Sequence, residues 1–158
     1  TVVIIRKDLL ENTPKNIPTM LRYSIHAEKD SLYNTPPSFS VYMVGLVLRW
    51  LKAQGGIAAI EKRNIAKAKL IYDTIDQSGG FYQGHADKDS RSLMNVTFRM
   101  PTEELEKQFV TEAAKAGLIG LKGHRSVSGL RASIYNAVSL ESCQALRDFM
   151  LEFQRKNG

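Results

Sequence analysis

The stretch that decides the fold is Met94-Asn95-Val96-Thr97-Phe98-Arg99-Met100-Pro101-Thr102-Glu103-Glu104-Leu105. It predicts a strand over Met94–Met100 followed by a helix over Thr102–Ala116. Thr102 is a suitable N-cap, and the glutamates that follow it place negative charge in the first turn, where the helix dipole favours it. Gly117 then ends the helix. The stretch therefore predicts a strand that passes directly into a covering helix.

The residues that follow repeat this pattern. Two more strands are expected at Leu118–Leu121 and Leu130–Tyr135, and a last helix at Ser139–Arg155. Strands followed by covering helices are typical of a two-layer α/β sandwich, so the fold class is α/β. Each helix carries an apolar stripe, made of Leu105, Phe109, Ala113 and Ala116 in the first and of Leu140, Cys143, Leu146, Phe149, Met150 and Phe153 in the last.

Upstream, Val2–Ile5 is a β-branched run that predicts a strand buried on both faces. Glu11–Asp30 has no clean period and is expected to be an irregular connection. One helix is then predicted from Thr35 to Gln54 and a second from Ile57 to Gln77. Their core-facing positions are expected to be Tyr42, Leu46, Trp50 and Ala53 in the first, and Ile57, Ile60, Ile65, Leu70 and Ile71 in the second.

Composition excludes several protein classes. The chain has 158 residues, 43% of them hydrophobic and 24% charged, which is ordinary for a globular protein and excludes disorder. The single cysteine, Cys143, excludes an intrachain disulfide and a cysteine-rich zinc site. The most apolar run, Val41–Leu48, is far shorter than the roughly 20 residues of a membrane helix, so no membrane partner is expected. A strand beginning at Thr1 suggests that the chain starts inside a domain.

The formal net charge of +6, from 22 basic and 16 acidic residues, raises the possibility of a nucleic-acid partner. An RNA-binding sheet displays aromatic residues for base stacking. Here Met94–Met100 holds one aromatic, Phe98, and Leu118–Leu121 holds none, so no nucleic-acid partner is expected.

A basic stretch between the last two strands could carry chemistry. Lys122, His124, Arg125 and Arg131 lie within ten residues, and no acidic residue occurs from Leu118 to Leu140. If Leu130–Tyr135 is a strand, Leu130, Ala132 and Ile134 share one face, and Arg131, Ser133 and Tyr135 share the other. Two guanidinium groups and an imidazole suit a ligand with two anionic groups, such as a carboxylate and a phosphate. A basic, solvated hairpin is the alternative.

Asn34 and Thr35 form a second candidate site. They stand where a helix is expected to begin, and the free N–H groups of a helix start favour a phosphate. The alternative is a plain N-cap without a ligand. Three other features are interpreted as structural: Cys143 as a buried small apolar residue, His26 and His85 as loop residues without a role, and the run Lys62, Arg63, Lys67 and Lys69 as a solvated helix face.

Four separated blocks resemble phosphoserine aminotransferases, a family of fold-type I enzymes that depend on pyridoxal phosphate. The blocks are Ser31-Leu32-Tyr33-Asn34-Thr35-Pro36-Pro37, Arg91-Ser92-Leu93-Met94-Asn95-Val96, Gly120-Leu121-Lys122-Gly123-His124-Arg125 and Arg131-Ala132-Ser133-Ile134-Tyr135-Asn136-Ala137. The resemblance implies that residues 1–54 are the end of the large cofactor-binding domain. Residues 55–158 then form a long linking helix and the small C-terminal domain.

The resemblance also implies roles for the site residues. Asn34 and Thr35 match the pair that reaches the cofactor phosphate in the neighbouring subunit of a homodimer. His124 and Arg125 match residues that hold the substrate phosphate, and Arg131 matches the arginine that grips the substrate carboxylate. Such enzymes transfer an amino group from glutamate to 3-phosphohydroxypyruvate in serine biosynthesis, often serve pyridoxine biosynthesis too, and are cytoplasmic.

One departure from the family pattern bears on activity. The lysine that forms the Schiff base in this family would lie just before Thr1, so the chain contains no catalytic residue of its own and is expected to be inactive alone. The alternative hypothesis is a stand-alone, non-catalytic α/β module that binds anions through the loop from His124 to Arg131.

Overall fold

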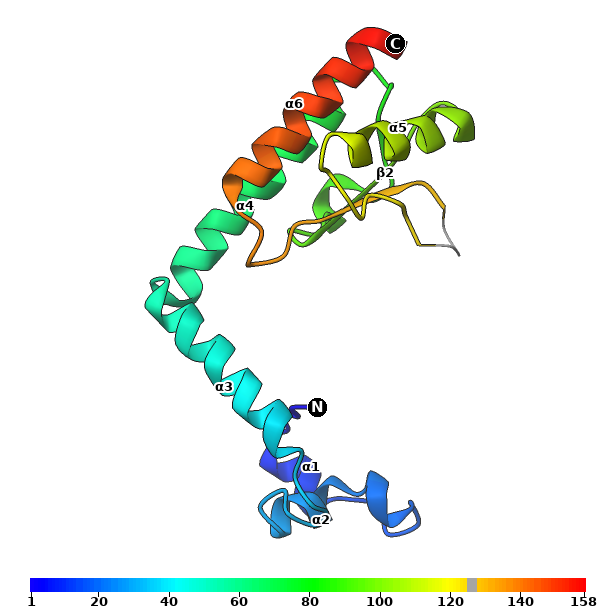
Figure 1. The fold of residues 1–158 in the computed structure, drawn as a ribbon. Helices are drawn as coiled ribbons and strands as arrows, with labels where there is room; N and C mark the ends of the chain where they lie inside the picture. The colour runs from blue at the N-terminus through cyan, green and yellow to red at the C-terminus, as the bar shows by residue number, and fades with distance from the viewer. Residues whose placement is uncertain (125–127) are drawn as a thin grey trace. The chain divides into compact units, whose positions relative to one another are not determined.

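A computed structural model describes residues 1–124 and 128–158 of the chain. These residues form two units, Thr1–Trp50 and Leu51–Gly158, each of which is described by itself. The second unit contains the α/β layers that the sequence predicts, and Figure 1 shows its helices in green to red.

The sheet of the second unit has three antiparallel strands in the order β1-β2-β3. They are β1 (Gln83–Gly84), β2 (Asn95–Arg99) and β3 (Leu130–Ser133). Gly84 is paired with Phe98, and Thr97 is paired with Arg131. Because side chains alternate along a strand, this register assigns every side chain of the sheet to one of two faces.

Three long helices accompany the sheet: α4 (Gly56–Asp76), α5 (Glu103–Lys115) and α6 (Leu140–Asn157), with a short 3₁₀ helix η2 (Lys88–Ser90) before β2. The expected cap of α5 is confirmed, because the Thr102 hydroxyl accepts a hydrogen bond from the N–H of Leu105 at 3.3 Å. Ser139 caps α6 in the same way, through the N–H of Ser142 at 3.2 Å. Figure 1 shows α4 and α6 side by side.

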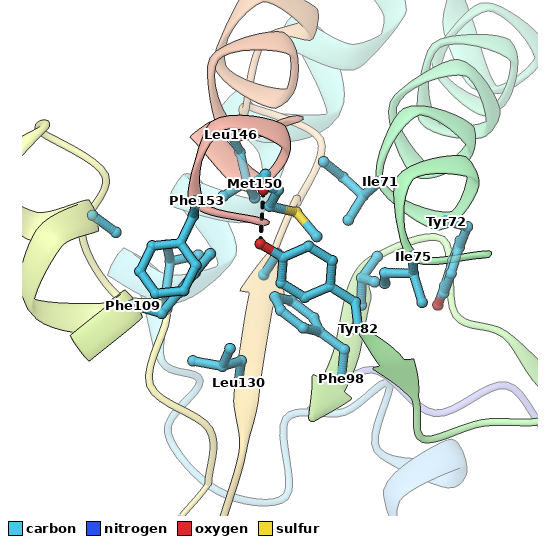
Figure 2. Packing of buried hydrophobic residues seen from close by; sticks show 14 of the residues in the cluster. Ile71, Tyr72, Ile75, Tyr82, Phe98, Phe109, Leu130, Leu146, Met150 and Phe153 are labelled. Atoms are coloured by element: carbon cyan, nitrogen blue, oxygen red, sulfur yellow. Dashed lines mark hydrogen bonds between the residues drawn. The ribbon is translucent and has the colours of Figure 1, made fainter. Parts of the chain in front are cut away.

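The core lies between the helices and the face of the sheet that carries Val96, Phe98, Leu130 and Ala132. Figure 2 shows the rings that fill it, with Phe109 of α5 and Phe153 of α6 in edge contact at 5.1 Å between ring centroids. The hydroxyl of Tyr82 donates to the carbonyl oxygen of Met150 at 2.8 Å, which satisfies the one polar atom of that ring inside the core. Burial of each large side chain contributes about 1.5–3 kcal/mol, so this cluster holds the two layers together.

The strand face predicted from the sequence is confirmed. Leu130, Ala132 and Ile134 are all buried, whereas Arg131 and Ser133 are half-buried and Tyr135 is exposed. The expected strand at Leu118–Leu121 is wrong. Its residues form no strand, and only the bridge between Lys122 and Leu130 extends the pairing beyond β3. Gly120 has a φ of 77°, a conformation outside the β region, which interrupts an extended segment there.

The first unit is helical. It contains α1 (Lys7–Glu11), η1 (Thr19–Leu21), α2 (Tyr23–Glu28) and most of α3 (Ser38–Ala53). The expected strand at Val2–Ile5 is wrong, since Thr1–Ile5 has no regular structure and Ile4 is 97% exposed. A buried strand needs neighbouring strands to pair its N–H and C=O groups, and the described part of this unit provides none.

Several expected core positions are also wrong. Tyr42, Leu46 and Trp50 of α3 are exposed, because an apolar helix face is buried only where another layer covers it and this unit has no such layer among its described residues. In α4, Ile57 and Ile65 are exposed, and the buried stripe runs instead through Ile60, Asn64, Lys67, Ala68, Ile71 and Ile75.

The interpretation of Lys67 as a solvated residue is wrong. Its side chain is fully buried, and its Nζ donates to the carbonyl oxygens of Ile134, Tyr135 and Val138 at 2.8–3.0 Å. Burial lowers the pKa of this amine, since desolvation disfavours the charged form. Three carbonyls use all three N–H donors of the ammonium group, so Lys67 fixes the turn between β3 and α6 to α4.

No single helix among the described residues is long and apolar enough to cross a membrane. The helices α3 and α4 reach the length and apolar composition of a membrane span only when they are taken together as one bent pair.

Candidate anion-binding site

The candidate site lies on the face of the sheet opposite the core. The strand register places Thr97 of β2 beside Arg131 of β3. On the other side of Thr97, the N–H of His85 donates to the Thr97 carbonyl oxygen at 3.2 Å, which continues the β1–β2 ladder by one residue. His85, Thr97 and Arg131 therefore form one row across the sheet, and side chains in such a row point the same way.

The backbone of Arg131 is fixed by hydrogen bonds, whereas N–H donors of its guanidinium group remain available to a ligand. Its N–H donates to the carbonyl oxygen of Leu121 at 2.8 Å, and its place in β3 fixes the direction of the side chain. The Nε of Arg131 is buried and has no hydrogen-bond partner among the described residues. A buried N–H without a partner is costly, so an acceptor supplied by a ligand would stabilise this arrangement.

A neighbouring row supports this one. The Oδ1 of Asn95 accepts hydrogen bonds from Ser133 Oγ at 3.0 Å and from Tyr135 OH at 3.2 Å. These bonds connect β2 with β3 and its exit on the polar face. They keep the strand that carries Arg131 in register.

His124 comes from the loop between Leu121 and Leu130. The loop is closed by two backbone hydrogen bonds, from Gly123 N–H to Gly129 O and from Ser128 N–H to His124 O, both at 2.8 Å. A Cβ at Gly123 would overlap the Ser128 carbonyl, and Gly129 has a φ of 74° and lies against Arg99. Both positions therefore require glycine.

These side chains surround a hollow of about 190 Å³, here called the Arg131 cleft. Its described lining contains four residues with cationic or ionisable nitrogen groups and no carboxylate. The lining residues are His85, Thr97, Phe98, Arg99, Gly123, His124, Ser128, Leu130 and Arg131. The chemistry of this lining suits an oxyanion such as a carboxylate or a phosphate.

The charge of one lining arginine is already balanced. Arg99 Nε donates to Glu106 Oε1 at 2.6 Å, and the same oxygen accepts the N–H of Met100 at 3.2 Å. A second hollow, of about 470 Å³, lies between α5 and the loop, and its lining combines Glu103 and Glu106 with lysines. Its mixed charge does not favour an anion, so the Arg131 cleft is the better candidate.

The other predicted site residues are Arg125, Asn34 and Thr35. Arg125 lies outside the described residues. Asn34 and Thr35 lie in the first unit, where both are exposed, and Asn34 Nδ2 contacts the Met20 sulfur at 3.6 Å. The expectation that Thr35 caps the helix is wrong, because α3 begins at Ser38 after Pro36 and Pro37. The structure thus brings together His124 and Arg131, and it adds His85, to which the sequence had assigned no role.

The sequence contained a signal for Lys67 but none for His85. Lys67 stands three residues after Asn64 and four before Ile71, so it falls on the buried stripe of α4. His85 follows a two-residue edge strand that has almost no periodicity, and only the pairing with β2 reveals its direction.

Comparison with known proteins identifies the family. The family model described as "Aminotransferase class-V" matches residues 1–146. The chain belongs to this family. The chain is similar to two curated relatives named phosphoserine aminotransferase. The relative from Lysinibacillus sphaericus is 66% identical over 157 residues. The relative from Geobacillus kaustophilus is 61% identical over 156 residues. Each match covers 99% of the chain and 43% of the relative, so the chain spans less than half of the relatives' length.

Solved structures agree with this assignment. The phosphoserine aminotransferase from Bacillus circulans subsp. alkalophilus is 58% identical with a TM-score of 0.90, over 98% of this chain and 43% of that one. A phosphoserine aminotransferase from Trichomonas vaginalis, described as bound to PLP, is 36% identical with a TM-score of 0.84, over 93% of this chain and 42% of that one. The resemblance inferred from the four sequence blocks is therefore confirmed for this class V aminotransferase chain.

Proposed function

We propose that the chain is the C-terminal part of a phosphoserine aminotransferase, a pyridoxal phosphate-dependent enzyme of serine biosynthesis. The observation that carries the proposal is the Arg131 cleft, in which a fixed arginine with a buried, unpartnered Nε faces the same hollow as His124. The identity of 58–66% with relatives of this name supports it.

In this proposal, three residues bind the substrate. Arg131 binds the substrate carboxylate through a bidentate pair, because its guanidinium matches the planar geometry of that group. His124 and Arg125 bind the substrate phosphate. The ligand is thus held at both anionic ends, as O-phosphoserine and 3-phosphohydroxypyruvate require.

Asn34 and Thr35 would hold the phosphate of the cofactor in the partner subunit of a homodimer. Their amide and hydroxyl groups are donors of the kind that a phosphate accepts, and both residues are exposed in the first unit, so their chemistry fits this group. Pyridoxal phosphate, when bound, supplies the electron sink for amino-group transfer.

The described lysines do not replace the lysine that the cofactor requires. Lys67 is the only buried lysine in the described part of the chain, and all three of its donors are bound to carbonyls. We therefore infer that the chain contributes recognition and dimer contacts, and that it is inactive when isolated. A cytoplasmic location and a second role in pyridoxine biosynthesis belong to the same proposal.

The test uses the complete protein with its cofactor. We expect O-phosphoserine and 2-oxoglutarate to give glutamate, whereas L-serine, which lacks the phosphate, should give at least tenfold less. Equal rates with the two amino acids would contradict a phosphate-binding role of the cleft.

The stand-alone anion-binding module makes the opposite prediction. The 158-residue chain alone would then bind phosphate as tightly as the complete protein, and the complete protein would form no glutamate. This outcome would replace the enzyme hypothesis.

A further inference from the structure

His85 is a cleft residue without a function in the site described so far. Its position follows from the sheet register, which pairs Gly84 with Phe98 and hence places His85 opposite Thr97. Gly84 and Phe98 belong to the core face, so the side chain of His85 stands on the opposite face, where it lines the Arg131 cleft.

The surroundings of His85 favour an anion. The imidazole makes no hydrogen bond to the described residues, and it is exposed to solvent while lining the cleft. On the same row, Thr97 adds a hydroxyl and Arg131 adds a guanidinium. The described lining of the cleft contains no carboxylate, and the nearby Glu106 is bound to Arg99.

We propose that His85 is a further binding residue of this site, donating to the phosphate of a phosphomonoester whose carboxylate is bound by Arg131. The inference rests on the proposed function and extends it by one specificity-determining residue. A phosphomonoester carries close to two negative charges near neutral pH, and it has three acceptor oxygens. Two histidines line the cleft, His85 from the sheet edge and His124 from the loop, and they can bind different oxygens of this group.

Donor geometry decides which residues bind the carboxylate of the ligand and which bind its phosphate. A guanidinium binds a planar carboxylate through two parallel N–H donors, whereas an imidazole offers a single N–H on the side facing the ligand. Single donors placed around a tetrahedral phosphate satisfy its separate oxygens. His85 therefore adds affinity for the phosphorylated substrate and not for glutamate, which has no phosphate.

The test compares His85→Gln and His85→Arg with the parent in the complete holoenzyme. Removing an N–H donor at the edge of a site should raise KM for O-phosphoserine about three- to tenfold in His85→Gln, with kcat and the KM for glutamate unchanged. His85→Arg keeps an N–H donor at this position and should restore most of the affinity. The matched control is Gln83→Ala, which lies on the same strand and face but outside the cleft lining and should change neither KM.

Two outcomes would overturn the inference: an unchanged KM for O-phosphoserine in His85→Gln, or an equal rise for O-phosphoserine and glutamate. Binding of inorganic phosphate to the same variants separates this inference from the proposed function. A protein that forms no glutamate, but binds phosphate three- to tenfold more weakly after His85→Gln, would disprove the aminotransferase proposal and leave the role of His85 intact.

Discussion

Strand register brings His85, Thr97 and Arg131 together although they are 12 and 34 positions apart in the sequence. The direction of the Arg131 side chain could be predicted from the sequence, because the alternating apolar residues of its short strand determine the two faces. His85 could not, since its direction depends on pairing with a distant strand. At the residue scale, the local sequence pattern predicts the direction of a side chain only where the strand or helix that carries it has a clear periodicity.

Lys67 provides a test at the same scale. Lys67→Met keeps most of the side-chain volume but leaves three buried or partly buried carbonyls without their donor. Because unsatisfied buried polar groups are costly, we expect a loss of about 3 kcal/mol in the free energy of unfolding, measured by urea denaturation. The matched control is Lys69→Met, two residues away, whose side chain is 69% exposed and pairs with Asp73 at the surface. It should change the free energy of unfolding by less than about 0.5 kcal/mol. Equal losses in both variants would contradict a stabilising role of the hydrogen bonds from Lys67 to the three carbonyls.

At the element scale, the helices of the second unit were predicted within two residues at each end, because their caps and stopping glycines are local signals. Two predicted strands failed for a different reason. Val2–Ile5 and Leu118–Leu121 have strand composition, but a strand forms only when a partner satisfies its backbone, and this depends on the rest of the fold.

The ion pair between Asp76 at the end of α4 and Arg91 before β2 is a second test at this scale. Arg91 donates to both carboxylate oxygens, at 2.6 and 2.9 Å, and its hydrogen bonds hold the pKa of Asp76 below the usual 3.8. A carboxylate with a lowered pKa stabilises the fold above the unfolded value and loses this contribution as the pH falls through its folded value.

We therefore expect Asp76→Asn to lose about 1 kcal/mol of unfolding free energy at pH 7 and progressively less as the pH falls below 3.8. The measurement is chemical denaturation at a series of pH values, with Asp148→Asn on the exposed side of α6 as the control. A deficit that stays constant down to pH 2 would contradict an electrostatic origin.

At the scale of the whole molecule, α3 exposes a long apolar surface that includes Phe39, Val41 and Tyr42, each at least 58% exposed. Patches of this kind mark interfaces. In the proposed enzyme, we expect the rest of the large domain and the partner subunit to cover this surface. The sequence predicted the apolar stripe of α3 but not its exposure, because burial depends on layers that the described chain does not contain.

This exposure predicts the behaviour of the isolated chain. We expect the 158-residue chain alone to self-associate in light scattering, and co-expression with the complementary part of the Geobacillus kaustophilus relative to give a defined dimer. An isolated chain that remains a monodisperse monomer at high concentration would contradict the interpretation of the apolar surface of α3 as an interface.

The central claim is that the Arg131 cleft recognises the carboxylate of an anionic substrate, and the most direct measurement is the kinetics of Arg131→Ala in the complete holoenzyme. We predict that kcat/KM for O-phosphoserine falls at least about 30-fold, because a charged bidentate pair is lost, and that Arg131→Lys recovers only part of it. The control Arg155→Ala removes an exposed arginine of α6 that pairs with Glu152 and should leave kcat/KM unchanged. Parent-like kinetics for Arg131→Ala would contradict the claim.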